Sequence, residues 1–131
     1  MTETTFHIRG ATVEIKTATP RLTVTDHVLP PGFAGPPLHI HPGFDEVFVV
    51  LEGSLAIRVE DEVHEVGPGD TSYVAGTTPH TFANTSGGAV RFMVAIAPGG
   101  FEEYFRAMAA GDDEGAAQAA ARFGYSAWPA G

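Results

Sequence analysis

The chain has 131 residues, of which 44% are hydrophobic and 18% charged, a composition typical of a globular protein rather than a disordered one. Sixteen Asp and Glu residues stand against seven Lys and Arg, and the net charge of -9 argues against nucleic acids and anionic membranes as partners. Cysteine is absent, which excludes disulfides, thiolate metal sites and cysteine nucleophiles. Histidine and carboxylate groups remain as the strong metal ligands.

The length suits one domain, and we expect residues 1–131 to form a single one. The longest apolar run, Val47–Leu51, is far too short to cross a bilayer. The N-terminus lacks the basic start and the apolar stretch of a secretory signal. We therefore expect a soluble protein in the cytoplasm.

Residues from about 11 to 97 read as a series of short strands, because runs rich in Val, Ile, Thr and Phe alternate with Gly, Pro or Asp clusters. The predicted strands cover residues 12–18, 22–28, 37–41, 46–52, 55–59, 62–66, 71–75, 80–84 and 89–96. The proline-rich segment 30–37 predicts a rim loop, since proline removes donors from a strand ladder. The pattern is that of an all-β sandwich or barrel.

The period of the apolar pattern changes after Pro98, where two short helices are predicted over about 101–123. The first carries four apolar residues at the spacing i, i+3, i+4 and i+7: Phe101, Tyr104, Phe105 and Met108. The second, rich in alanine, is predicted from Glu114 to Phe123. Beyond it, we expect Trp128 to fold back over the barrel or over a partner subunit, because burying an indole is favourable.

Two histidines two residues apart, His39 and His41, are the first candidates for a site. On a strand their side chains point to one face, about 6–7 Å apart, and their rings can converge on one ion. Glu46 follows five residues later, and a bulge at the Pro42-Gly43 turn would bring its carboxylate to the same face. His80 opens a later strand that can deliver a third imidazole.

Three imidazoles and one carboxylate suit a divalent transition metal ion such as Fe, Mn, Ni, Co or Zn. A five- or six-coordinate ion would keep one or two positions open for water, oxygen or substrate, as catalytic sites do. The sequence therefore predicts one such ion, without choosing among these metals.

The spacing of these residues resembles the two sequence motifs of the cupin superfamily. Residues that match the first motif are His39, His41, Glu46 and Gly53. Residues that match the second are Gly69, His80 and Asn84, while Ala75 and Thr77 stand where the motif has proline and glycine, and Gly76 lies one position early. The resemblance implies a double-stranded β-helix, or jelly-roll, barrel with short C-terminal helices, and a metal held by His39, His41, Glu46 and His80. It also implies a homodimer.

Segments 45–53 and 101–105 look like those of small bacterial cupins commonly labelled quercetinase-like dioxygenases. That resemblance implies a catalytic role for Glu46, as metal ligand and as proton acceptor from a small enolic or phenolic substrate. Two other functions stay open: a redox-neutral cyclase, isomerase or decarboxylase that uses the same metal, and a cupin that binds a small molecule without catalysis.

Several phenylalanines are candidates for a substrate pocket, because ligand pockets are mostly apolar. Phe33 and Phe44 lie in loops at the expected mouth of the barrel. Phe48 shares strand parity with Glu46, and Phe82 with His80, so both are candidates as well, although they and Phe92 would equally serve as plain core.

The other three histidines, His7, His27 and His64, have no comparable neighbours in the sequence. We expect them at the surface or at the edges of the sheets.

Overall fold

The structure, a computed structural model, describes residues 4–129. Its strands are β1 (Thr5–Ile8), β2 (Ala11–Ala18), β3 (Thr23–Leu29), β4 (His39–Ile40), β5 (Asp45–Glu52), β6 (Leu55–Val59), β7 (Glu62–Val66), β8 (Thr71–Val74), β9 (His80–Ala83), β10 (Val90–Ala97) and β11 (Ser126–Ala127). Its helices are α1 (Glu102–Ala109) and α2 (Asp113–Arg122).

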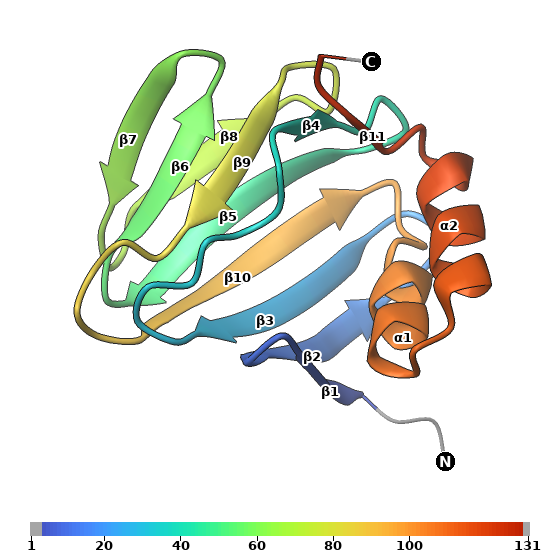
Figure 1. The fold of residues 1–131 in the computed structure, drawn as a ribbon, viewed down its shortest axis with the longest axis horizontal. Coiled ribbons are helices and arrows are strands. Elements are labelled where there is room, and N and C mark those ends of the chain that lie inside the picture. The colour runs from blue at the N-terminus through green and yellow to red at the C-terminus, as the bar shows by residue number, and fades with distance from the viewer. Residues whose placement is uncertain (1–3, 130–131) are drawn as a thin grey trace.

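The strands form two antiparallel sheets that face each other across the core. One sheet has the order β1-β2-β3-β10-β5-β8 and the other the order β11-β4-β9-β6-β7. The β6–β7 hairpin lies at one side of the molecule, and both helices lie at the opposite side (Figure 1). The predicted all-β jelly roll with short C-terminal helices is confirmed.

The nine predicted strands are all present, but β4 is shorter than predicted and two further strands appear. The structure has only His39–Ile40 in place of residues 37–41, because the prolines before it cannot enter a ladder. The additional strands, β1 and β11, are short and lie at sheet edges. Trp128 follows β11, and its backbone N–H donates to Leu38 O at 2.9 Å, so the tail does fold back, although the indole stays 46% exposed.

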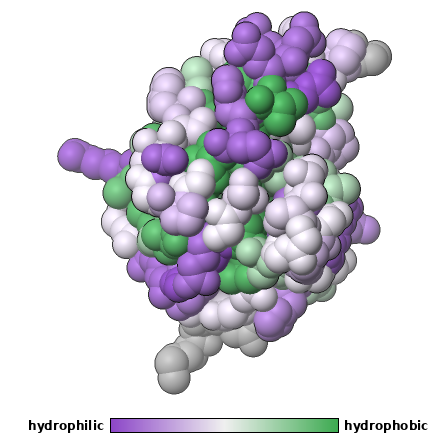
Figure 2. Space-filling model, turned by 90° about the vertical axis from the view of Figure 1, so that its left-hand side faces the viewer, coloured by the Kyte–Doolittle hydropathy of each residue, from purple (hydrophilic) through white to green (hydrophobic). Residues whose placement is uncertain are grey.

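Alternation along the strands separates the core from the surface. On β10 the inward residues are buried and stack in one layer: Val90, Phe92, Val94 and Ile96. Leu55 and Ile57 of the other sheet are fully buried in the same cluster. The side of the molecule that carries β6 and β7 interleaves hydrophilic with hydrophobic residues (Figure 2). No helix within residues 4–129 is long and apolar enough to span a membrane.

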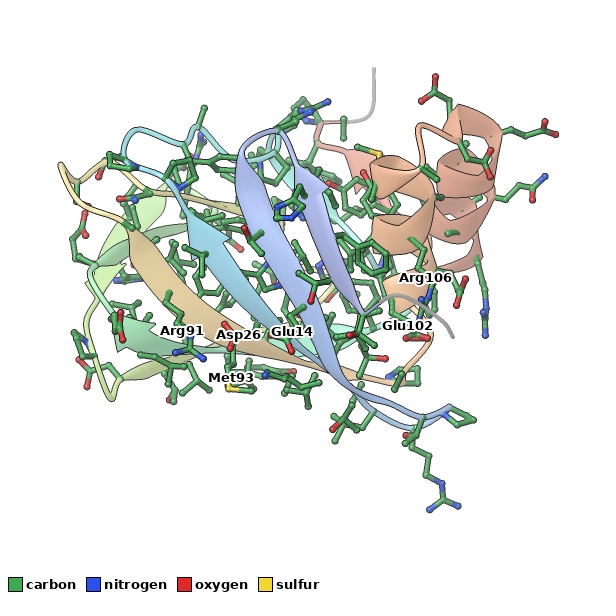
Figure 3. The ribbon with its side chains drawn as sticks, turned by 90° about the horizontal axis from the view of Figure 1, so that it is seen from below. Glu14, Asp26, Arg91, Met93, Glu102 and Arg106 are labelled. Atoms are coloured by element: carbon green, nitrogen blue, oxygen red, sulfur yellow. The ribbon has the colours of Figure 1, made fainter. Side chains whose placement is uncertain are left out.

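On the outer face of the larger sheet, Asp26 of β3 and Arg91 of β10 form a cross-strand ion pair (Figure 3). Arg91 Nη2 donates to Asp26 Oδ2 at 2.7 Å, and Arg91 Nε donates to Asp26 Oδ1 at 3.2 Å. Because successive residues of a strand face opposite ways, this pair places the neighbouring His27 on the inner face.

Helix α1 is tied to the sheet by Glu102, a buried carboxylate in its first turn. Glu102 Oε1 accepts a hydrogen bond from the Thr23 hydroxyl at 2.6 Å and another from the Gly100 N–H at 3.0 Å. The contact fixes α1 beside β3, near the end of the sheet at which Glu102 is seen in Figure 3.

We expect Glu102→Ala to lower the free energy of unfolding by about 1–3 kcal/mol, because it leaves the buried Thr23 hydroxyl without its acceptor. Urea denaturation followed by circular dichroism measures the change. The matched control is Glu103→Ala, which removes an exposed ion pair with Arg106 and should cost less than about 1 kcal/mol. Equal losses in the two variants would contradict the anchoring role of Glu102.

Candidate metal centre

Three imidazoles converge between β4 and β9. His39 lies on β4 directly opposite His80, the first residue of β9, and His41 follows β4 by one residue. All three side chains are buried, and one ring nitrogen from each lies within 4.8 Å of the others. The structure thus brings together the three histidines that the spacing predicted.

A backbone carbonyl orients each ring. The Nδ1 atoms lie 2.8 Å from Pro37 O for His39, 2.9 Å from Phe44 O for His41 and 2.7 Å from Thr78 O for His80. Since a carbonyl only accepts, each Nδ1 carries a hydrogen, and the neutral ring keeps its lone pair on Nε2. This is the arrangement by which metal-binding histidines are usually held.

Glu46, near the start of β5, contacts two of the three histidines. Its Oε1 lies 3.0 Å from His41 Nε2 and 2.9 Å from His80 Nε2, and these two nitrogens are 2.9 Å apart. Three electron-rich atoms this close repel one another unless a positive charge lies among them. A proton on one ring supplies that charge, and so does a metal cation. The nitrogen and oxygen donors therefore fit a divalent transition ion.

The protonation states agree with this picture. Burial alone would raise the pKa of Glu46, but the hydrogen bonds from His41 and His80 outweigh it and hold this pKa at about 2. Burial lowers the pKa of His41, yet the hydrogen bond with Glu46 raises it above its usual value. For His39, burial dominates and lowers the pKa to about 4. At neutral pH Glu46 is an anion and His39 is neutral.

Gly76, the glycine that lies one position early in the second motif, has no room for a side chain. A Cβ on Gly76 would collide with the carbonyl oxygens of His41 and Phe44, so only glycine fits there. The His41 N–H donates to Gly76 O at 2.8 Å, and the Gly76 N–H donates to Asp45 Oδ1 at 2.9 Å. At Gly76 the turn before β9 thus packs directly on the loop formed by residues 41–44.

Asn84, the last matched residue of the second motif, holds the proline-rich segment 30–37 in place. Its amide Nδ2 donates to Pro30 O at 3.1 Å, and its backbone N–H donates to Phe33 O at 2.9 Å. The Thr81 hydroxyl donates to Pro36 O at 2.6 Å. Segment 30–37 is a loop, as predicted, and it forms one wall of the cavity described next.

A cavity of about 660 Å³ opens from the histidine cluster between the sheets, segment 30–37 and α1. The four predicted pocket residues all line it: Phe33, Phe44, Phe48 and Phe82. Phe92 is not among the lining residues and packs as core. The cavity volume is in the range of ordinary ligand sites. That these residues contact a substrate stays a prediction.

The prediction for His27 was wrong. His27 is 6% exposed, faces inward from β3 and lines the cavity, whereas His7 and His64 are exposed as predicted. The alternation of β3 does not reveal this, because Val24 and Val28 lie on the outer face and Thr25 lies on the inner face beside His27.

Tyr125 was missed altogether. Its ring stacks on that of His39, with 4.6 Å between centroids and 22° between planes, and it lines the cavity. The adjoining β11 pairs with β4, so that Ala127 lies opposite His39. The C-terminal segment therefore packs directly against a candidate metal ligand.

Residues 26–96, more than half of the chain, match the sequence profile of the cupin domain family. The chain belongs to the cupin family. The predicted family and its barrel are confirmed, whereas the likeness to quercetinase-like members stays a prediction.

Several solved structures resemble this cupin. TT1209 from Thermus thermophilus is 29% identical, with 63% of this chain and 77% of that chain covered and a TM-score of 0.58. A sugar phosphate isomerase from Silicibacter pomeroyi is 27% identical, with 69% and 60% covered and a TM-score of 0.61. The polyketide cyclase RemF from Streptomyces resistomycificus is 25% identical, with 72% and 68% covered and a TM-score of 0.60.

A curated relative of this cupin, the uncharacterized protein MJ1618 of Methanocaldococcus jannaschii, is 38% identical over 47 residues. The match covers 36% of this chain and 38% of that protein, so this cupin spans well under half of the relative's length.

Proposed function

We propose that this cupin is a metal-dependent enzyme that takes a proton from a small, largely apolar enolic or phenolic compound. One observation carries the proposal: the Glu46 carboxylate lies within 3.0 Å of two imidazole nitrogens at the end of a mainly apolar cavity. His39, His41, Glu46 and His80 would hold the ion. When bound, a divalent ion acts as a Lewis acid that lowers the pKa of a substrate hydroxyl.

Glu46 is the proton acceptor in this proposal. Its Oε1 contacts His41 and His80, whereas its Oε2 makes no hydrogen bond to any residue between 4 and 129. Because no buried side-chain oxygen or nitrogen of those residues lacks a partner, Oε2 is open to the cavity that Glu46 lines. The hydrogen bonds that lower the pKa of Glu46 need a proton on the rings. Rings that coordinate an ion through Nε2 have no such proton to donate, and the positive charge of the ion would then stabilise the Glu46 carboxylate in their place.

Two reactions can follow the deprotonation. The likeness of segments 45–53 and 101–105 to quercetinase-like cupins supports a dioxygenase, in which the deprotonated substrate is the electron donor to dioxygen. The names of two similar solved structures, a sugar phosphate isomerase and a polyketide cyclase, support a redox-neutral cyclisation or isomerisation as the second candidate.

The test is Glu46→Gln in metal-loaded protein, assayed on a panel of small phenols and enols by product chromatography. Turnover should fall roughly 100- to 10,000-fold, because a general base is lost, while bound metal falls far less. The matched control is Glu52→Gln, an exposed position on the same strand, which should keep full activity. Undiminished turnover in Glu46→Gln would contradict the proposal.

Oxygen dependence separates the two reactions. A dioxygenase consumes dioxygen in step with substrate and stops under anaerobic conditions, whereas a cyclase or isomerase continues. Tight binding of panel compounds by the metal-loaded wild type, with no product in either atmosphere, would instead indicate a non-catalytic binding protein.

A further inference from the structure

His27 is a buried histidine that the proton transfer at Glu46 does not use. Its ring stacks on Phe92, with 4.9 Å between centroids and 3° between planes, and meets the Phe105 ring edge-on at 5.6 Å. The side chain is 6% exposed and lines the cavity. Two aromatic neighbours therefore fix the plane of an imidazole that borders the ligand space.

The hydrogen bonding of Thr25 determines which nitrogen of His27 carries the hydrogen. His27 Nε2 lies 2.8 Å from Thr25 Oγ1, and the fully buried Thr25 hydroxyl makes no other hydrogen bond within residues 4–129. If Nε2 were the donor, the hydroxyl hydrogen of Thr25 would be buried without an acceptor, which folded proteins rarely tolerate. Thr25 therefore donates to Nε2, and the hydrogen of the neutral ring sits on Nδ1.

This Nδ1–H has no acceptor in the part of the chain that the structure describes. Every buried side-chain nitrogen or oxygen there has a partner, so an unpartnered Nδ1 must be open to the cavity. Burial lowers the pKa of His27 to about 4, and the ring is thus a neutral donor at physiological pH. A rigid, almost enclosed donor aimed into a mainly apolar cavity is the kind of group that fixes ligand orientation.

We propose that His27 is a substrate-binding residue whose Nδ1–H donates to an oxygen acceptor of the substrate other than the group that Glu46 deprotonates. Glu46 lies in register with Ile96, and Ile96 with Thr23, so His27 is four residues further along the sheet. Glu46 is near enough for its charge to act on His27, where it opposes the effect of burial on the pKa of the ring. The inference rests on the proposed function, which supplies the substrate hydroxyl that Glu46 deprotonates. It adds that the substrate carries a second oxygen, which accepts a hydrogen bond.

Two matched probes test this. One is a phenol with a para-acetyl group; the second carries isopropyl in place of acetyl, with the same shape but no acceptor. Calorimetric titration of the metal-loaded full chain gives both dissociation constants. The wild type should bind the acetyl probe roughly tenfold more tightly than the isopropyl probe.

The variant is His27→Phe combined with Thr25→Val, which removes both partners of a hydrogen bond while keeping their shape and so spares the fold. We expect it to bind both probes alike, with the isopropyl probe held as tightly as by the wild type. If the variant still prefers the acetyl probe, the proposal is overturned. It is also overturned if the variant binds both probes more weakly by the same factor, as a packing role would produce. A wild type that binds neither probe overturns it as well.

Glu46→Gln separates this inference from the proposed function. Its substitution leaves both His27 and Thr25 in place, so the roughly tenfold preference for acetyl should survive in it even though turnover is lost. If no compound is turned over by the wild type, the proposed function fails, while a preference that depends on His27 still supports the binding role. A preference that depends on Glu46 and not on His27 overturns that role.

Discussion

His80→Ala is expected to bind a divalent transition metal at least roughly 100-fold more weakly than the wild type, because even residues that only orient a ligand contribute 10- to 100-fold. His80 Nε2 contacts both His41 and Glu46, so its removal opens the centre of the cluster. His39→Ala should behave in the same way. Elemental analysis of protein purified without chelator or nickel resin, followed by metal titration, gives occupancy and affinity.

The matched control is His64→Ala, which removes an exposed histidine of β7 and should keep the metal content of the wild type. We expect near one equivalent of metal in the wild type and in the control. We expect this metal to be lost in both His80→Ala and His39→Ala. Full occupancy in His80→Ala, or no uptake by the wild type on reconstitution, would refute the metal centre.

Gly76→Ala is expected to lower the free energy of unfolding by about 3 kcal/mol, at the upper end of overpacking effects. The added methyl group has to displace the carbonyl oxygens of His41 and Phe44, which belong to backbone and not to a flexible side chain. Because Phe44 O is the acceptor for His41 Nδ1, metal affinity should also fall, by roughly 10- to 100-fold. Urea denaturation and metal titration measure the two effects separately.

Gly87→Ala is the control for that variant, since a Cβ there meets no atom within 4 Å. It should change neither stability nor metal affinity. If Gly76→Ala has the free energy of unfolding and the metal affinity of the wild type, the turn before β9 adjusts without moving the histidine rings, and the prediction is wrong.

The barrel and the histidine cluster could be predicted from the sequence because both depend on local rules. Strand periodicity and turn residues locate the strands, and the spacing from His39 to Glu46 matches a motif that needs no knowledge of packing. The spacing around Gly76 showed a departure from that motif, but not that a Cβ on Gly76 would collide with the backbone of a distant loop. Such contacts do not show in the local pattern.

His27 and Tyr125 could not be predicted for different reasons. On β3 both faces carry polar and apolar residues. On the outer face the polar residue is Asp26, which is buried in its ion pair with Arg91. Parity therefore does not distinguish the cavity side. Tyr125 precedes a strand of two residues, too short for any period, and its position depends on pairing with β4. For Phe48 and Phe82, parity indicates the inner face but cannot distinguish a cavity wall from core.

The acceptors that aim the three histidine rings are main-chain carbonyls, and this bears on how the protein can change during evolution. A substitution at Pro37, Phe44 or Thr78 replaces a side chain and leaves the carbonyl oxygen in place. The carbonyl contacts by themselves therefore place no constraint on these three side chains, and an alignment would show no trace of what orients the rings. A one-residue insertion or deletion within 37–44 or 76–80 would shift a carbonyl away from its ring. Around this site, selection therefore has to preserve loop length as well as residue type at positions such as Gly76.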